Sequence, residues 1–67
     1  MTAAQFEQLD ALEAEELLLL RFGALVRAGY DPGRALVLAS HVEVDVVLAS
    51  NLVSRGCPPE TALRIVL

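Results

Sequence analysis

Glycine and proline residues divide this chain into segments of helical length. Gly29 stands shortly before Pro32, and Gly56 stands shortly before Pro58. A glycine readily takes the left-handed conformation that ends a helix, and a proline is tolerated in the first turn, where its missing N–H has no acceptor. Leu, Ala and Val fill the segments between, and no period-two alternation is long enough to indicate a sheet. The sequence therefore predicts an all-α fold, a small bundle of three to four helices.

The first segment begins with a helix signal and contains an internal weakness. Thr2 and Gln5 have the spacing of a capping box, in which each side chain satisfies the free backbone N–H of the other residue. Gly23 weakens a helix by roughly 1 kcal/mol relative to Ala. Residues 2–28 therefore form either one long helix or two helices joined near Leu20–Gly23.

Acidic residues are concentrated at the N-terminus. Residues 1–20 contain no arginine and carry the acids Glu7, Asp10, Glu13, Glu15 and Glu16. Such a run is typical of a solvated helix face, and it also suits a basic partner. We therefore divide the chain into an acidic N-terminal helical arm at residues 1–20, a three-helix core at residues 21–56 and a C-terminal helix at residues 57–67.

Asp31 is placed to cap a short second helix over Pro32–Ser40, because its carboxylate can accept from free N–H groups of the first turn. In this helix Ala35, Leu36 and Ala39 are expected to face inward at helical spacing.

The third helix is expected at Val44–Arg55 and the fourth from Pro58 to the chain end. Valines at the start of the third segment favour a strand by propensity, but a lone strand cannot satisfy its backbone groups, so we predict a helix. Glu60 falls near the third helical position, where it can reach back to the cap. Ile65 and Leu67 belong to an apolar end that is expected to dock on the protein or on a partner.

The composition provides more apolar surface than a small domain can bury. Of the 67 residues 55% are hydrophobic, and the mean hydropathy is +0.54. A single domain of this size buries only roughly 60% of its unfolded surface. Because contiguous exposed apolar patches mark interaction sites, we expect a protein partner or a homo-oligomer.

The charge argues against two other classes of partner. The net charge is −4 and the pI about 4.6, whereas a nucleic-acid-binding surface is basic. Anionic membrane surfaces attract Lys and Arg, and charged residues interrupt the apolar stretch from Ala35 to Val53. We therefore expect a cytoplasmic or virion-associated protein that binds neither nucleic acid nor membrane.

Reactive side chains occur singly, without a catalytic constellation. Cys57 is the only cysteine, so neither an internal disulfide nor a Cys-based zinc site can form. His41 lies in a turn without converging ligands, and we expect it to be structural or solvent-facing. Tyr30, at a helix–loop corner, either fills space in the bundle core or lies exposed at the top of a binding patch. The sequence predicts no enzyme, no cofactor and no metal site.

Several positions between residues 25 and 53 match the pattern of a known family. They are the loop Ala28-Gly29-Tyr30, the pairs Ala35-Leu36 and Leu38-Ala39, the acid Asp45, the small residue Ala49 and the pair Leu52-Val53. With these positions the segment resembles a ubiquitin-associated (UBA-like) three-helix bundle. It departs from the family pattern at Ala28, where the family has methionine, and the Leu-Val pair falls about one residue early.

In that family the Gly-Phe loop and the end of helix 3 form an apolar patch that docks on a ubiquitin-like β-surface. The resemblance therefore implies that Gly29, Tyr30, Leu52 and Val53 contact a partner. The first hypothesis is accordingly an adaptor that presents this patch.

The segment Arg55–Ile65 resembles the tail of short, uncharacterised actinobacterial and actinophage proteins, which implies a virion or prophage context. The alternative hypothesis is therefore a structural subunit, such as a small capsid-associated component. Its contacts are expected in the stretch with Leu18 and Phe22 and in the tail with Ile65 and Leu67.

Overall fold

The computed structural model describes all 67 residues and contains five helices and no strand. The helices are α1 (Ala3–Glu7), α2 (Ala11–Ala28), α3 (Pro32–Ser40), α4 (Val46–Ser54) and α5 (Pro59–Val66). This confirms the all-α prediction, with one helix more than the three to four expected. None of the five combines the length and apolar character that a membrane crossing requires.

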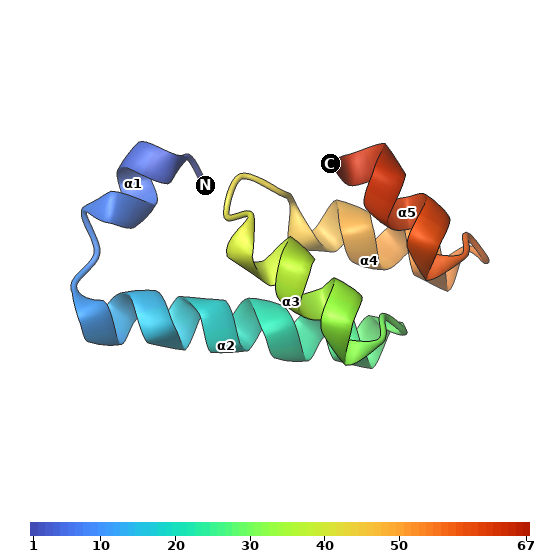
Figure 1. The fold of residues 1–67 in the computed structure, drawn as a ribbon, viewed down its shortest axis with the longest axis horizontal. Helices are drawn as coiled ribbons and strands as arrows, with labels where there is room; N and C mark the ends of the chain where they lie inside the picture. Colours follow the sequence, from blue (N-terminus) through green and yellow to red (C-terminus); the bar gives the residue numbers. More distant parts are fainter.

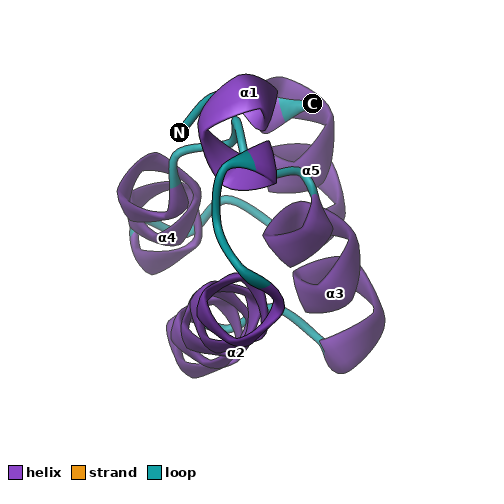
Figure 2. Ribbon diagram, turned by 90° about the vertical axis from the view of Figure 1, so that its left-hand side faces the viewer, coloured by secondary structure: helices purple, strands orange, loops and turns teal.

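The longest helix, α2, forms one side of the molecule. It packs against α3 and α4, and α5 packs against the same two helices from the opposite side (Figures 1 and 2). The short α1 lies over the first turns of α2, on the side where the other helices lie (Figure 1). One whole face of α2 is consequently turned away from the rest of the chain.

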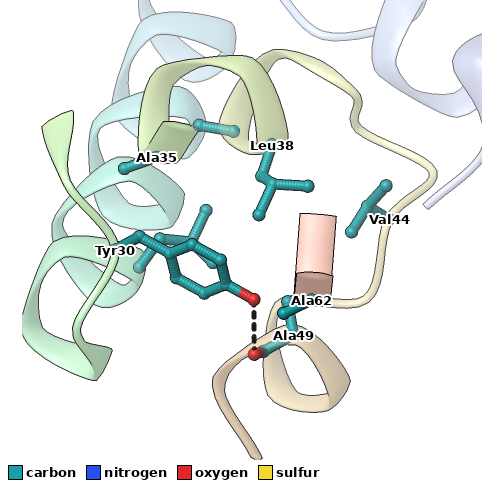
Figure 3. Packing of buried hydrophobic residues seen from close by; sticks show 8 residues of the cluster. Tyr30, Ala35, Leu38, Val44, Ala49 and Ala62 are labelled. Atoms are coloured by element: carbon teal, nitrogen blue, oxygen red, sulfur yellow. Dashed lines mark hydrogen bonds between the residues drawn. The ribbon is translucent and has the colours of Figure 1, made fainter. Parts of the chain in front are cut away.

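The core between these helices is built mainly of small side chains. Leu25 and Leu38 are the largest fully buried residues. Around them lie Tyr30, Val44 and the four alanines Ala35, Ala39, Ala49 and Ala62 (Figure 3). Small residues at the contacts let helix backbones approach closely, so short helices can share one core.

Tyr30 is part of this core, with 2% of its surface exposed. Its hydroxyl donates a hydrogen bond of 2.8 Å to the carbonyl oxygen of Ala49 (Figure 3). A buried hydroxyl needs such a partner, because its desolvation is otherwise costly. Tyr30 therefore attaches the corner after α2 to α4, the first of its two predicted roles.

The N-terminal segment forms two helices, but they meet at Gln8–Asp10 rather than near Leu20–Gly23. The predicted Thr2–Gln5 capping box is present. A second box begins α2, where the Asp10 carboxylate accepts from the backbone N–H of Glu13 at 2.8 Å.

Helix α2 continues through Gly23 without interruption, so the joint predicted there is wrong. Its inner face carries Phe22 and Leu25 on either side of the glycine, and packing of this face outweighs the roughly 1 kcal/mol cost of a glycine. Residue 20, the predicted end of the arm, consequently lies inside α2.

Helix α3 has the predicted bounds, and Asp31 caps it by accepting from the N–H of Arg34 at 3.2 Å. Its inward face differs from the prediction at one position. Leu38 is fully buried, whereas Leu36 is 62% exposed. Because α3 packs against both α2 and α5, its buried arc is centred on Ala35, Leu38 and Ala39.

Helix α4 begins two residues later than expected, because Asp45 is its N-cap and accepts from the N–H of Val47 at 2.9 Å. In α5 the predicted role of Glu60 is wrong, since the helix has no side-chain cap. The N-cap residue is Pro58, which has no N–H for Glu60 to accept from. Glu60 instead lies 3.6 Å from Arg34.

Candidate functional site

An apolar groove of about 740 Å³ lies between the N-terminal half of α2 and the length of α3. Its large lining side chains are Leu18, Leu19 and Phe22 from α2 and Leu36 from α3. Glu15 is the only charged residue in its lining. The groove is therefore suited to apolar side chains from another molecule.

Small residues explain why this space is not filled. Ala11, Ala14, Gly33 and Ala39 line the groove without projecting far from their helices. The 18 residues of α2 also extend past the nine residues of α3, so the first turns of α2 lack a full packing partner. The opening follows from helix lengths and small side chains, and it needs no rearrangement to form.

The edges of the groove expose large apolar side chains. Leu19 is 63% and Leu36 is 62% exposed, one on each helix. Phe22 is half-buried and also packs against the core. A ligand in the groove would thus cover exposed leucines while resting on side chains that the fold already holds in place.

Arg21 fixes the position of α3 beside α2. Its guanidinium donates to the carbonyl oxygens of Leu38 at 3.1 Å, Ala39 at 3.0 Å and His41 at 2.8 Å. Carbonyl groups at the end of a helix have no intrahelical donor, and a cation there also complements the helix dipole. Arg21 was not singled out from the sequence, although a lone arginine within the run Leu17–Phe22 was an available signal.

Burial lowers the pKa of Arg21, while the charges of Glu43 and Asp45 act in the opposite direction. An arginine nevertheless stays protonated in proteins. The charge is therefore a permanent part of the α2–α3 contact and maintains one end of the groove.

Exposed ion pairs at the start of α3 link this helix to α5. Arg34 contacts Asp31 at 2.9 Å and Glu60 at 3.6 Å. The hydrogen bond from the Arg34 side chain, followed by that from its backbone N–H, lowers the pKa of Asp31. Exposed pairs of this kind contribute little to stability, so their main effect is to orient side chains.

The four residues implied by the UBA-like resemblance come together where α2 ends against α4. Gly29 has a φ of 124°, and a Cβ atom on it would lie 2.9 Å from Cγ1 of Val53. Tyr30 is buried, and Leu52 and Val53 are half-buried against the core. These residues join two helices and present little side-chain surface.

The other predicted contact residues lie at two separate places. Leu18 and Phe22 line the groove. Ile65 and Leu67 are exposed on the last turn of α5 and at the chain end, whereas Leu63 and Val66 pack against the core. The apolar C-terminal end of the chain thus packs on the core with one side of α5 and leaves the other side exposed.

His41 and Cys57 make local contacts. The Nδ1 atom of the exposed His41 lies 2.7 Å from the carbonyl oxygen of Val37. The half-buried Cys57 places its Sγ 3.7 Å from the carbonyl oxygen of Pro58. No group of three His, Cys, Asp or Glu side chains is arranged to hold a metal ion.

Comparisons with protein families, with curated proteins and with solved structures find no match to this chain.

Proposed function

We propose that this protein is a non-enzymatic interaction module that binds a protein partner through the groove between α2 and α3. The observation that carries the proposal is an apolar groove of about 740 Å³ with an exposed leucine on each edge. Burying such side chains is the main favourable contribution to protein association. The rigid contacts of Arg21 and Phe22 support a binding surface formed before the partner arrives.

An amphipathic helix is the partner segment that the groove suits. Grooves between two helices accept a third helix through apolar side chains at positions i, i+3 or i+4, and i+7. Glu15 is the one acidic residue that lines the groove. A basic residue beside the apolar stripe of the partner would complement this charge.

The UBA-like resemblance offers a different surface, around Gly29, Tyr30, Leu52 and Val53. We favour the groove because Tyr30 is buried and already uses its hydroxyl within the core. In this proposal a UBA-like arrangement of helices would bind its ligand on another face, since a fold does not fix its ligand.

The test compares the native chain with Leu36→Glu and Val37→Glu, neighbours on α3 of which only Leu36 lines the groove. Each immobilised protein is incubated with an extract of the cells that make it. A partner in the groove is retained by the native chain and by Val37→Glu, and is lost with Leu36→Glu. The purified partner should then titrate one-to-one with the same order of affinities.

The helicity of both variants, measured by circular dichroism, shows whether the fold is intact. Leu36 is largely exposed, so its replacement by Glu should leave the fold unchanged. If every retained protein binds Leu36→Glu as well as the native chain, the groove is not the binding surface.

A structural subunit is the second candidate, favoured by apolar side chains outside the groove. Leu12, Leu20, Ile65 and Leu67 are all exposed. In an assembly such as a virion, these side chains would be covered by neighbouring subunits. Light scattering over a range of protein concentrations distinguishes this candidate, because only the subunit forms particles larger than a dimer, by itself or with its neighbours.

A further inference from the structure

The outward face of α2 carries a pattern that the fold does not use. Glu16, Leu20, Gly23 and Arg27 are spaced by four, three and four residues, which places them along one line of a helix. This line is opposite Leu25, which is fully buried. The remaining helices all lie on the other side of α2 (Figures 1 and 2). Glu16, Leu20 and Arg27 are exposed, and Gly23 is half-buried.

The side chains on this face have no partner within the chain. Leu20 is 70% exposed. Glu16 and Arg27 take part in neither of the ion pairs that the fold contains. A Cβ atom added to Gly23 would meet only the Arg27 side chain, so no other element covers this glycine. A shallow hollow of about 420 Å³ lies here between Glu16, Leu19, Leu20 and Arg27, of which Leu19 also lines the groove.

We propose that this face pairs with the same face of a second copy, with the two α2 helices antiparallel about a two-fold axis. In this register Glu16 lies against Arg27 of the second copy, and Arg27 lies against its Glu16. Leu20 lies over Gly23 of the second copy, where the guanidinium of that copy's Arg27 lies 3.2 Å from the position of an added Cβ atom and has to turn away toward Glu16 of the first copy to make room. The pairing uses a face of α2 that adjoins the groove at Leu19 and adds a second binding surface to the proposed function.

The charges on this line determine both which molecule binds the outward face of α2 and in which direction its helix runs. One end of the line is acidic and the other is basic. A second copy that runs in the opposite direction therefore places its basic end against the acidic end of the first. A parallel pair would place Glu16 against Glu16 and Arg27 against Arg27, which is repulsive. A two-fold interface uses the same patch on both copies, and each favourable contact is therefore made twice.

The test uses two charge reversals, Glu16→Arg and Arg27→Glu, and sedimentation velocity of the full chain over about a hundredfold range of concentration. The native chain is expected to be a dimer that dissociates on dilution and weakens as salt is added. Each variant places two pairs of like charges in the interface, and its dimer should weaken by roughly tenfold or more. An equimolar mixture should restore the dimer, because the heterodimer regains two opposite-charge pairs.

Arg64→Glu is the matched control, since it makes the same charge change on an exposed residue of α5. It should leave the dimer unchanged, as should the groove variant Leu36→Glu. Circular dichroism separates loss of pairing from loss of fold. A native chain that stays monomeric at all concentrations overturns the proposal, as does a dimer that tolerates both reversals or a mixture that fails to restore it.

Discussion

Gly29 shows how one residue determines the joint between two helices. Its φ of 124° is a conformation that residues with a Cβ atom rarely adopt, and Val53 occupies the place where that atom would lie. The sequence identified Gly29 as a helix end and the resemblance made it a contact residue. The structure adds that the absence of a side chain lets α4 approach α2.

Replacement of Gly29 by Ala is expected to destabilise the fold through both strain and steric overlap. Gly56 is the matched control, because its φ is 97° and nothing lies within 4 Å of an added Cβ atom. Gly56→Ala should cost about 1–2 kcal/mol from strain alone. Gly29→Ala should cost about 1–3 kcal/mol more, from overpacking against Val53. Urea unfolding measures both, and equal losses would show that the Val53 contact is irrelevant.

Tyr30 makes the stability of the fold depend on pH in the alkaline range. Burial, assisted by the charge of Cys57, raises the pKa of Tyr30 in the folded protein. The folded state then holds the phenolic proton more tightly than the unfolded chain, in which the tyrosine titrates at about pH 10. The contribution of this proton to the free energy of unfolding is complete below that pH. It is lost as the pH rises through the pKa that Tyr30 has in the folded protein.

The variant Tyr30→Phe should consequently show two effects. At neutral pH it should cost about 1–2 kcal/mol, because the buried carbonyl of Ala49 loses its donor. Above about pH 10 its stability should fall less steeply than that of the native chain. Urea denaturation at neutral and alkaline pH provides the measurement, and parallel losses in both proteins would contradict the role given to the phenol.

At the scale of elements, Arg21 is the contact that holds α3 to α2. Arg21→Met keeps the aliphatic stem but removes the donor to the carbonyl groups of Leu38 and Ala39. The carbonyl of His41 loses one of two donors, since it still accepts from the N–H of Val44 at 2.9 Å. We expect a loss of about 2–3 kcal/mol and faster amide exchange in the last turn of α3.

The variant Arg21→Lys tests whether Arg21 stabilises the fold through the geometry of its guanidinium or through its charge. A lysine keeps the positive charge but lacks the planar fork that reaches three carbonyls. Its stability should lie between those of Arg21→Met and the native chain. Full stability in Arg21→Lys would instead assign the whole effect to the helix dipole.

Helix ends were predictable where the signal was local. Asp31 followed by Pro32 fixed the start of α3, and Gly29 and Gly56 marked the ends of α2 and α4. The break before α2 was missed because Asp10 contributed only charge to the prediction, whereas its spacing to Glu13 is that of a capping box.

The groove could not be predicted, because it depends on how α3 lies on α2. Leu36 was assigned to the core from its spacing, and only the tertiary arrangement turns it toward the groove edge. Leu18 and Phe22 were chosen for their apolar character, which is the part of the site that the sequence does contain.

At the scale of the whole molecule, α1 is the element that the fold needs least. It contains no buried residue, and Asp10 already caps the helix that follows. A chain beginning at Asp10 should therefore retain the helicity of the other four helices and unfold within a few degrees of the full chain, since the loss is below about 1 kcal/mol.

A chain beginning at Leu17 is the informative comparison, because it lacks Ala11, Ala14 and Glu15 of the groove. It should fold less stably and lose the partner that the native chain binds. Thermal unfolding followed by circular dichroism checks both truncations. A large loss from removing residues 1–9 alone would mean that α1 belongs to the core.

Finally, the alanine-rich interior has a thermal consequence. Leu25 and Leu38 are the only large side chains that are completely buried, so melting exposes little hydrocarbon to water. The heat capacity of unfolding scales with that newly wetted area, and so does the sensitivity to denaturant. The stability curve of this protein should therefore be shallow, with a broad melting transition, a small m-value and only a weak tendency to cold denaturation.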